Sequence, residues 1–160
     1  MLFSAKTSYQ IACIMAPKFA VILNDEEPLQ NATALIKRYG LEHRSVPGVH
    51  IGLSHTDFIA GFEGNPQRII DELRTAARIA IARGATLLVT GFAAINAVLA
   101  QHGIREVDGV PILDSQATVI RIAEMMVDFR KLGMPKPGRG PLYNVTHADI
   151  EIARKIYGAP

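Results

Sequence analysis

The stretch Ala85-Thr86-Leu87-Leu88-Val89-Thr90-Gly91-Phe92-Ala93-Ala94-Ile95-Asn96 decides the fold. Its first half is an unbroken apolar and β-branched run into Thr90-Gly91, which is typical of a strand buried on both faces. A helical pattern from Ala93 to His102 follows at once. The turn between them would point free backbone N–H groups and the positive end of the helix dipole at whatever lies above the strand. It is therefore the first place to expect a bound anion.

Length and composition favour one globular domain, extending over residues 1–160. The 160 residues are 49% hydrophobic and 20% charged, and 17 basic residues against 15 acidic ones give a net charge of +2. This balance, without a basic cluster, argues against nucleic acid or an anionic membrane as a partner. The single cysteine, Cys13, excludes a disulfide framework and a cysteine zinc site, and a reducing cytoplasm is the expected location. The start has no apolar signal-peptide core, and no run approaches the ~18 apolar residues of a membrane span.

Strand and helix patterns alternate along the whole chain. Apolar runs predict strands at 19–23, 85–90 and 110–113, with a weaker candidate at 45–53 because of Pro47 and two glycines. Helices are predicted over 5–16, from Pro28 to Tyr39, from the N-cap pair Asn65-Pro66 to Arg83, over 93–102, over 116–131, and from Thr146 to Tyr157. Residues 54–64 are expected to be a polar, flexible loop. The alternation predicts an α/β fold, a doubly wound and mostly parallel sheet of about four strands with helices on both faces.

Helical spacing also predicts which residues of the helix 116–131 are buried. They are Val119, Ile122, Ala123, Met126 and Val127. Such a stripe is typical of a helix that covers one face of a sheet.

Ligands of open parallel sheets bind at the carboxyl ends of the strands. In this chain those ends are Leu23-Asn24, Thr90-Gly91 and Asp114-Ser115. The candidate ligand-binding residues are therefore Asn24, Thr90, Gly91, Phe92, Ala93 and Asp114. Each has a structural alternative: Asn24 as a turn residue, the Thr90–Ala93 segment as an ordinary strand–helix turn, and Asp114 as a helix N-cap, which is the favoured interpretation of Asp114.

His50, His55 and Asp57 are close in sequence and could form a metal or acid–base cluster. Their spacing is not that of ligands one helical turn apart, and no metal site is predicted. Cys13 falls on the predicted first helix and is interpreted as a core-facing cysteine rather than a nucleophile.

Several segments together resemble the aspartate/glutamate/hydantoin racemase superfamily, especially the second half of its hydantoin and allantoin racemase branch. They are Phe19-Ala20-Val21-Ile22, Arg38-Tyr39-Gly40-Leu41, Gly84-Ala85, Leu88-Val89-Thr90-Gly91 and Val110-Pro111-Ile112-Leu113-Asp114. The resemblance implies a racemase-like lobe over 17–133 and a tail with a C-terminal helix over 134–160. Within the tail, Gly133 to Tyr143, with Lys136 and Arg139, resembles the family segment that returns to the other lobe.

The same resemblance implies a mechanism without metal or cofactor. Family members have two similar lobes with the active site between them, and each lobe offers one cysteine. One cysteine removes the α-proton of the substrate and the other returns a proton from the opposite face. The helix N-terminus after the strand–turn binds the substrate carboxylate.

This chain departs from that pattern. Phe92 stands where the family has its second cysteine, and the lobe that carries the first cysteine would precede residue 10. Cys13 matches neither position. After the first strand, Leu23 and Asn24 replace threonines that are common in the family. Two-cysteine racemisation is therefore not available to this chain alone.

Three functions remain open from the sequence. The first is a degenerate racemase relative that binds a small carboxylate or hydantoin-like ligand without a cofactor. The second is an isomerase or decarboxylase of the same fold that uses His55 or Asp114 as its acid or base. The third is a non-catalytic interaction module, with a homo-oligomer as the expected state, because a lost lobe would uncover an apolar face.

Overall fold

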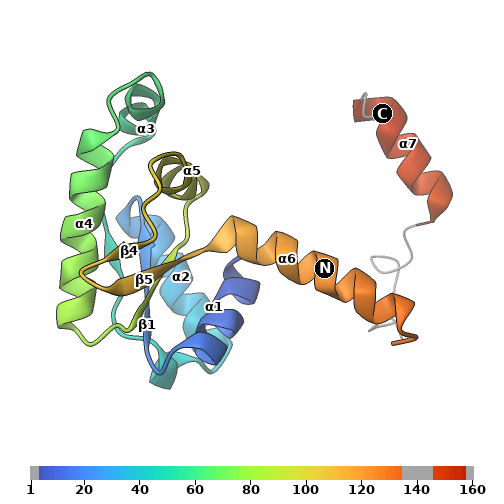
Figure 1. Ribbon diagram of the computed structural model, residues 1–160, viewed down its shortest axis with the longest axis horizontal. Helices are drawn as coiled ribbons and strands as arrows, with labels where there is room; N and C mark the ends of the chain where they lie inside the picture. Colours follow the sequence, from blue (N-terminus) through green and yellow to red (C-terminus); the bar gives the residue numbers. More distant parts are fainter. Residues whose placement is uncertain (1–3, 135–145, 158–160) are drawn as a thin grey trace. The chain divides into compact units, whose positions relative to one another are not determined.

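The computed structural model describes residues 4–134 and 146–157 (Figure 1). The described residues divide into two compact units, one within 4–123 and the other made of 124–134 and 146–157. The first unit holds the sheet and all the candidate ligand-binding residues. The prediction of a single domain over 1–160 stays a prediction.

A five-stranded sheet with the order β2-β1-β3-β5-β4 forms the centre of the first unit. The strands are β1 (Phe19–Leu23), β2 (Val49–His50), β3 (Leu87–Thr90), β4 (Glu106–Val107) and β5 (Val110–Asp114). β2, β1, β3 and β5 are parallel, and only the two-residue β4 pairs antiparallel with its neighbour β5. The predicted α/β class with a mostly parallel sheet is confirmed. The weak strand candidate at 45–53 contributes the short edge strand β2, where a nearby proline is tolerated.

The helices match the predicted segments, with one addition. They are α1 (Ser4–Met15), α2 (Glu26–Arg38), α3 (His55–Phe62), α4 (Gln67–Ala82), α5 (Ala93–Gln101), α6 (Ser115–Lys131) and α7 (His147–Tyr157). The observed starts lie within two residues of the expected positions. α2 begins at Glu26 after the N-cap Asp25, two residues before Pro28, and the N-cap of α4 is Pro66 rather than Asn65.

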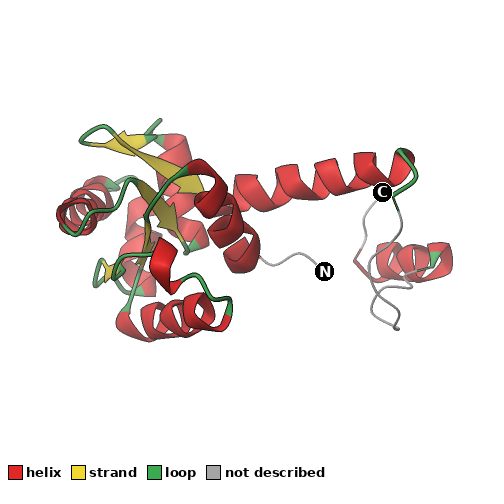
Figure 2. Cartoon of the chain, turned by 90° about the horizontal axis from the view of Figure 1, so that it is seen from below, coloured by secondary structure: helices red, strands yellow, loops and turns green. Residues whose placement is uncertain are grey.

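Alternate residues of the central strands are buried on opposite faces of the sheet. Ala20, Ile22 and Leu88 pack with residues of α3, α4 and α5. Phe19, Val21, Leu23, Leu87 and Val89 pack with residues of α1 and α2. Figures 1 and 2 show helices on both sides of the sheet. The unbroken apolar runs in β1 and β3 are thus explained, because in a doubly covered sheet both side-chain directions lead into the core.

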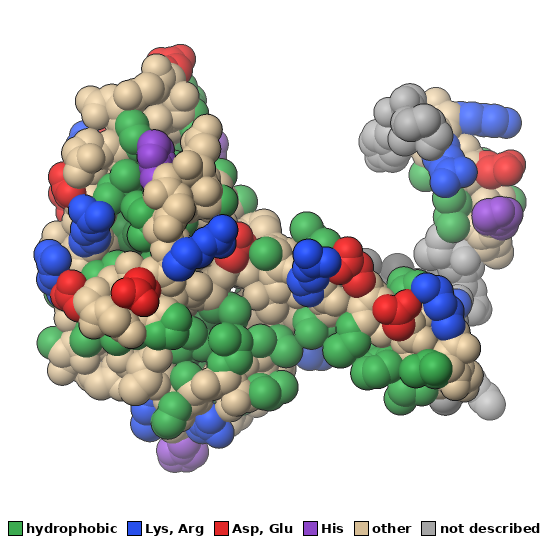
Figure 3. Space-filling view, in the orientation of Figure 1, with side chains coloured by type: hydrophobic (Ala, Val, Ile, Leu, Met, Phe, Trp, Pro, Cys, Tyr) green, Lys and Arg blue, Asp and Glu red, His purple; other side chains and the backbone are tan. Residues whose placement is uncertain are grey.

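Charged side chains are spread over the visible surface rather than gathered by sign (Figure 3). Within the residues that the structure describes, no helix is long and apolar enough to cross a membrane.

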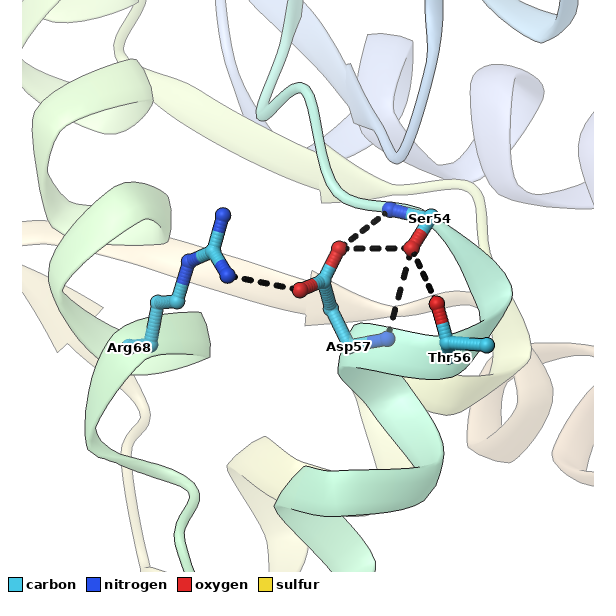
Figure 4. A network of polar contacts seen from close by, with 4 residues as sticks. All are labelled: Ser54, Thr56, Asp57 and Arg68. Atoms are coloured by element: carbon cyan, nitrogen blue, oxygen red, sulfur yellow. Dashed lines mark hydrogen bonds and ion pairs between the residues drawn. The ribbon is translucent and has the colours of Figure 1, made fainter.

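The expectation of a flexible loop over residues 54–64 was wrong, because this segment contains helix α3. A capping box starts the helix: Ser54 Oγ accepts from the backbone N–H of Asp57 at 3.4 Å, and Asp57 Oδ2 accepts from the N–H of Ser54 at 2.8 Å (Figure 4). Arg68 of α4 donates to Asp57 Oδ1 at 2.7 Å. The hydrogen bonds from Ser54, with the Arg68 charge, hold the pKa of the Asp57 carboxyl below its ordinary value. Ser54-x-x-Asp57 is a helix-start signal within a polar segment.

The predicted buried stripe of α6 was also wrong. Val119, Ile122, Ala123 and Met126 are only half-buried, Val127 is 51% exposed, and Ser115 is the buried residue of this helix. Residues from Glu124 onward, with Met126 and Val127 among them, belong to the second unit. Periodicity therefore identified the helix and its apolar side correctly, but not the burial of that side.

Arg44 fixes the carboxyl end of α1 to the rest of the first unit. Its Nη2 donates to the carbonyl oxygens of Cys13 at 2.6 Å and Ala16 at 2.8 Å, and its Nε donates to that of Pro17 at 3.1 Å. A guanidinium at this position satisfies carbonyls that α1 leaves without intrahelical partners and opposes the negative end of its dipole.

Replacing Arg44 by alanine should lower the free energy of unfolding by about 2 kcal/mol, because three charge-assisted hydrogen bonds are lost together. Urea denaturation monitored by circular dichroism measures this change. Arg74→Ala is the matched control, since Arg74 lies exposed on α4 and makes no hydrogen bond or ion pair with a described residue. Equal midpoints for the two variants would contradict the role assigned to Arg44.

Candidate functional site

The carboxyl ends of β1, β3 and β5 lie side by side at one edge of the sheet. Ile22 is in register with Thr90, and Thr90 is in register with Asp114. β1 has β2 on one side and β3 on the other, so the chain changes direction across the sheet between β1 and β3. Such a switch point leaves a crevice above the strand ends. The structure therefore brings Asn24, Thr90–Ala93 and Asp114 to the edge where a ligand of this architecture binds.

Gly91 lets the turn after β3 come close to β1. Its N–H donates to the carbonyl oxygen of Ile22 at 3.0 Å. A Cβ on Gly91 would lie 2.7 Å from Cδ2 of Leu23 and 3.5 Å from Cγ1 of Val21. Any larger residue would have to displace the end of the Leu23 side chain, so the close approach explains glycine at this position.

Phe92 is the N-cap of α5 and supplies no side-chain acceptor. Its backbone is extended, with φ −112° and ψ 128°, and no side chain caps the helix. The backbone N–H groups of the first turn, beginning at the exposed Ala93, are therefore not consumed by a capping residue. The Phe92 ring packs edge-on against Phe58 of α3 at 5.0 Å between ring centroids and lies 6.2 Å from the ring of His55.

Thr90 directs its side chain into a buried hydrogen-bond network rather than toward solvent. Thr90 Oγ1 donates to Asn96 Oδ1, and Asn96 Nδ2 donates to Ser115 Oγ at 2.9 Å and to Gln116 Oε1. Ser115 Oγ donates to the carbonyl oxygen of Thr90 at 2.7 Å. Thr90 is 0% and Asn96 3% exposed. The network joins the end of β3 to the first turns of α5 and α6, and it leaves the Thr90 hydroxyl without access to a ligand.

Asp114 acts as the cap of α6. Its Oδ1 accepts from the backbone N–H groups of Gln116 at 2.9 Å and Ala117 at 3.0 Å. The predicted capping interpretation is confirmed. The carboxylate oxygen that would take part in proton transfer is therefore engaged with the backbone of α6.

Asn24 is half-buried directly after β1. Its carbonyl oxygen accepts from the N–H of Leu53 at 3.1 Å. Within the described part of the chain its side chain makes no hydrogen bond. The amide of Asn24 is thus free to contact a molecule at the strand edge.

Cys13, His50 and His55 belong to three different elements. Cys13 is on α1, and burial raises the pKa of its thiol above the ordinary value, against the opposing effect of Arg44. His50 is exposed at the end of β2, and His55 is exposed at the start of α3. Among the described residues, no group of three or more His, Cys, Asp or Glu side chains is placed to hold a metal ion. The predicted tail residues Lys136, Arg139 and Tyr143 lie outside the described residues.

A cavity of about 370 Å³ lies between α1 and α2 beside Gly91. Leu23 and Val89 line it from the sheet, and Ser8 and Ala32 line it from the two helices. Sequence reasoning missed it, because small residues on helices also indicate ordinary close packing. Ser8 and Ala32 both line the cavity, but they indicate it only once it is known that α1 and α2 lie on either side of it.

Comparison with known proteins shows which solved structures have a similar fold. No protein-family model matches the chain, and no curated protein matches it. The chain shares its fold with two allantoin racemases. The enzyme from Klebsiella pneumoniae superposes with a TM-score of 0.67 at 20% identity, over 91% of this chain and 61% of its own. Allantoin racemase AllR from Pseudomonas fluorescens gives 0.61 at 16% identity, over 86% and 59%. The chain thus spans about three fifths of their length, and the likeness shows the fold.

Asn96→Ala should lower the free energy of unfolding by about 2–3 kcal/mol, because Thr90, Ser115 and Gln116 all lose a buried partner. Thermal or urea unfolding of the purified variant measures the loss. The matched control is Asn65→Ala, since Asn65 is exposed before α4 and its side chain makes no hydrogen bond with a described residue. A stability like that of the control would mean that the network is not structural.

Proposed function

We propose that this chain is a racemase-fold protein that binds a small carboxylate or hydantoin-like ligand at the strand edge without racemising it. The observation that carries the proposal is Phe92. It occupies the N-cap of α5, next to the exposed Gly91, and packs against Phe58 with a ring that can neither give nor accept a proton. By the resemblance to the racemases, this position belongs to a catalytic cysteine.

The support for binding comes from the backbone. The first-turn N–H groups of α5 lack a side-chain cap, and Ala93 at this end is exposed. Such groups, with the positive end of the helix dipole, stabilise a carboxylate or a polarised carbonyl oxygen. The free amide of Asn24, at the end of the adjacent β1, supplies a second hydrogen-bonding group.

The support for loss of racemisation comes from the available bases. Inversion at a carbon needs one group to remove a proton and another to return one from the opposite face. The thiol of Cys13 is on α1, its pKa is raised, and the carbonyl of the same residue is held by Arg44. A raised pKa lowers the thiolate fraction that would act as the base.

A second candidate function is acid–base catalysis by His55. Its ring lies 6.2 Å from the Phe92 ring and is exposed at the same end of the sheet. A neutral imidazole nitrogen can accept a proton, so His55 would be the base of an isomerase or decarboxylase. Asp114, the other residue considered for this role, is engaged in capping α6.

We expect no racemisation of allantoin, hydantoins, aspartate or glutamate by the purified chain above the level of a Cys13→Ala variant. Polarimetry or circular dichroism of the substrate measures the change in enantiomer ratio. Turnover that Cys13→Ala abolishes would overturn the proposal. Turnover that survives in Cys13→Ala but is lost in His55→Ala would instead favour the second candidate.

A thiol at the turn should report the field of the α5 N-terminus. In a Cys13→Ala background, Phe92→Cys should have a thiol pKa below the ordinary value of ~8.5, because the helix dipole and free N–H groups favour the thiolate. The ultraviolet absorbance of the thiolate against pH measures this pKa. Ala97→Cys in the same background is the matched control, since Ala97 is exposed farther along α5. Equal pKa values in the two variants would argue against an anion site at the turn.

A further inference from the structure

The cavity between α1 and α2 is a second place where a small molecule could bind. Its volume of about 370 Å³ falls within the ~300–1,000 Å³ of typical small-molecule sites. It shares Gly91 with the strand–turn, but its other lining residues differ from those of the proposed ligand site. In the view of Figure 3, hydrophobic side chains gather over α1.

Small side chains keep this space open. Ala5 and Ser8 line it from α1, Ala32 lines it from α2, and Gly91 lines it at the turn. Leu23 and Val89 belong to the buried core on this face of the sheet and make the inner wall apolar. An apolar group bound there would displace water from this apolar wall, and the removal of apolar surface from water favours binding.

The charges around the cavity are of one sign. None of the described residues that line it is a lysine, arginine or histidine, and Glu27 supplies a carboxylate. Burial raises the pKa of Tyr9, which also lines the cavity, to about 12, so this phenol is neutral at ordinary pH. Within the part of the chain that the structure describes, the exposed Glu27 side chain makes no hydrogen bond or ion pair. The carboxylate is therefore free to pair with a cation.

The helix dipoles near the cavity do not reverse this preference. The positive end of the α2 dipole is already offset by two carboxylates. One is that of Asp25, whose Oδ1 accepts from the N–H of Glu26 at 2.7 Å, and the other is that of Glu27. The N-terminus of α6 is capped by Asp114. An added anion would meet the Glu27 carboxylate, and no basic side chain among the described lining residues would offset the repulsion.

We infer that the cavity between α1 and α2 binds a small ammonium ion with a short apolar chain or ring. The ammonium group pairs with the Glu27 carboxylate, and the side-chain oxygen of Asn31, one helical turn later on α2, accepts a second hydrogen bond. The apolar part occupies the space against Leu23, Ala32 and Val89. This inference does not depend on the proposed function, because the strand–turn site prefers the opposite charge.

Hexylamine, 1-hexanol and hexanoate have six-carbon chains and differ in the charge of the head group. Comparing their affinities therefore separates the contribution of charge from that of apolar contact. Each is titrated into the isotopically labelled full chain at neutral pH and fixed ionic strength, and amide chemical shifts are followed. We expect hexylamine to bind most tightly of the three, with millimolar affinity and saturable shifts at Ser8, Ala32 and Leu35.

Two variants test the carboxylate. Glu27→Gln should weaken hexylamine binding about fivefold while leaving 1-hexanol unchanged, because one partly exposed ion pair is lost. Glu26→Gln is the matched control, since Glu26 is the adjacent residue and does not line the cavity. It should leave all three affinities unchanged.

The possible outcomes separate the two sites. Hexanoate binding as tightly as hexylamine, absence of saturable shifts at the cavity, or an equal effect of both Glu variants would overturn the inference. Hexanoate shifts confined to the amides of Phe92 and Ala93 would support the strand–turn site. If hexylamine at the same time shifts no amide at the cavity, the inference about the cavity is overturned. Hexylamine binding at the cavity without any hexanoate shift at the turn would uphold this inference and count against the proposed function.

Discussion

The amide of Asn96 is the contact on which the functional edge of the sheet depends. From the first turn of α5 it accepts from the Thr90 hydroxyl and donates to Ser115 Oγ, so three elements are joined through one side chain. These groups are buried, and buried polar groups are costly unless they are all paired. The network therefore fixes how β3, α5 and α6 meet. It also sets which groups are left for a ligand, because the Thr90 side chain is consumed and the backbone of the following turn is not.

The sheet could be predicted because its signal is local. Every position of β1 and β3 is buried, since helices cover both faces, and glycines that follow the helices mark their ends. The segment of α3 lacked that signal. Its helix is specified by the Ser54–Asp57 capping box and by Phe58, which packs against Phe92 from a distant part of the chain. For α6 the local pattern was sufficient for the helix but not for its surroundings, because burial depends on which element covers a face.

For the site, the sequence located the edge but not the use of each side chain. Asn24, Gly91 and Asp114 lie where the order of strands and turns put them, since parallel strands share one carboxyl edge. Whether a polar side chain faces a ligand or its neighbours depends on tertiary contacts. Thr90 and Asp114 are both engaged within the protein, and the cavity beside Gly91 arises from facing small residues of α1 and α2. No local pattern encodes such a space.

The turn at Gly91 and Phe92 separates two environments with different chemistry. On the α3 side, the Phe92 ring packs against Phe58, and the uncapped first-turn N–H groups of α5 favour negative charge. On the side of α1 and α2, a cavity with an apolar wall has Glu27 among its lining residues, which favours positive charge. In the proposed function, a racemase-like scaffold lacks a proton-transfer residue and keeps selective binding, because the dipole, the strand register and the cavity walls belong to the backbone and the core. The chemistry of proton transfer, by contrast, resides in single side chains, so the proposal makes its loss depend on the one residue at position 92.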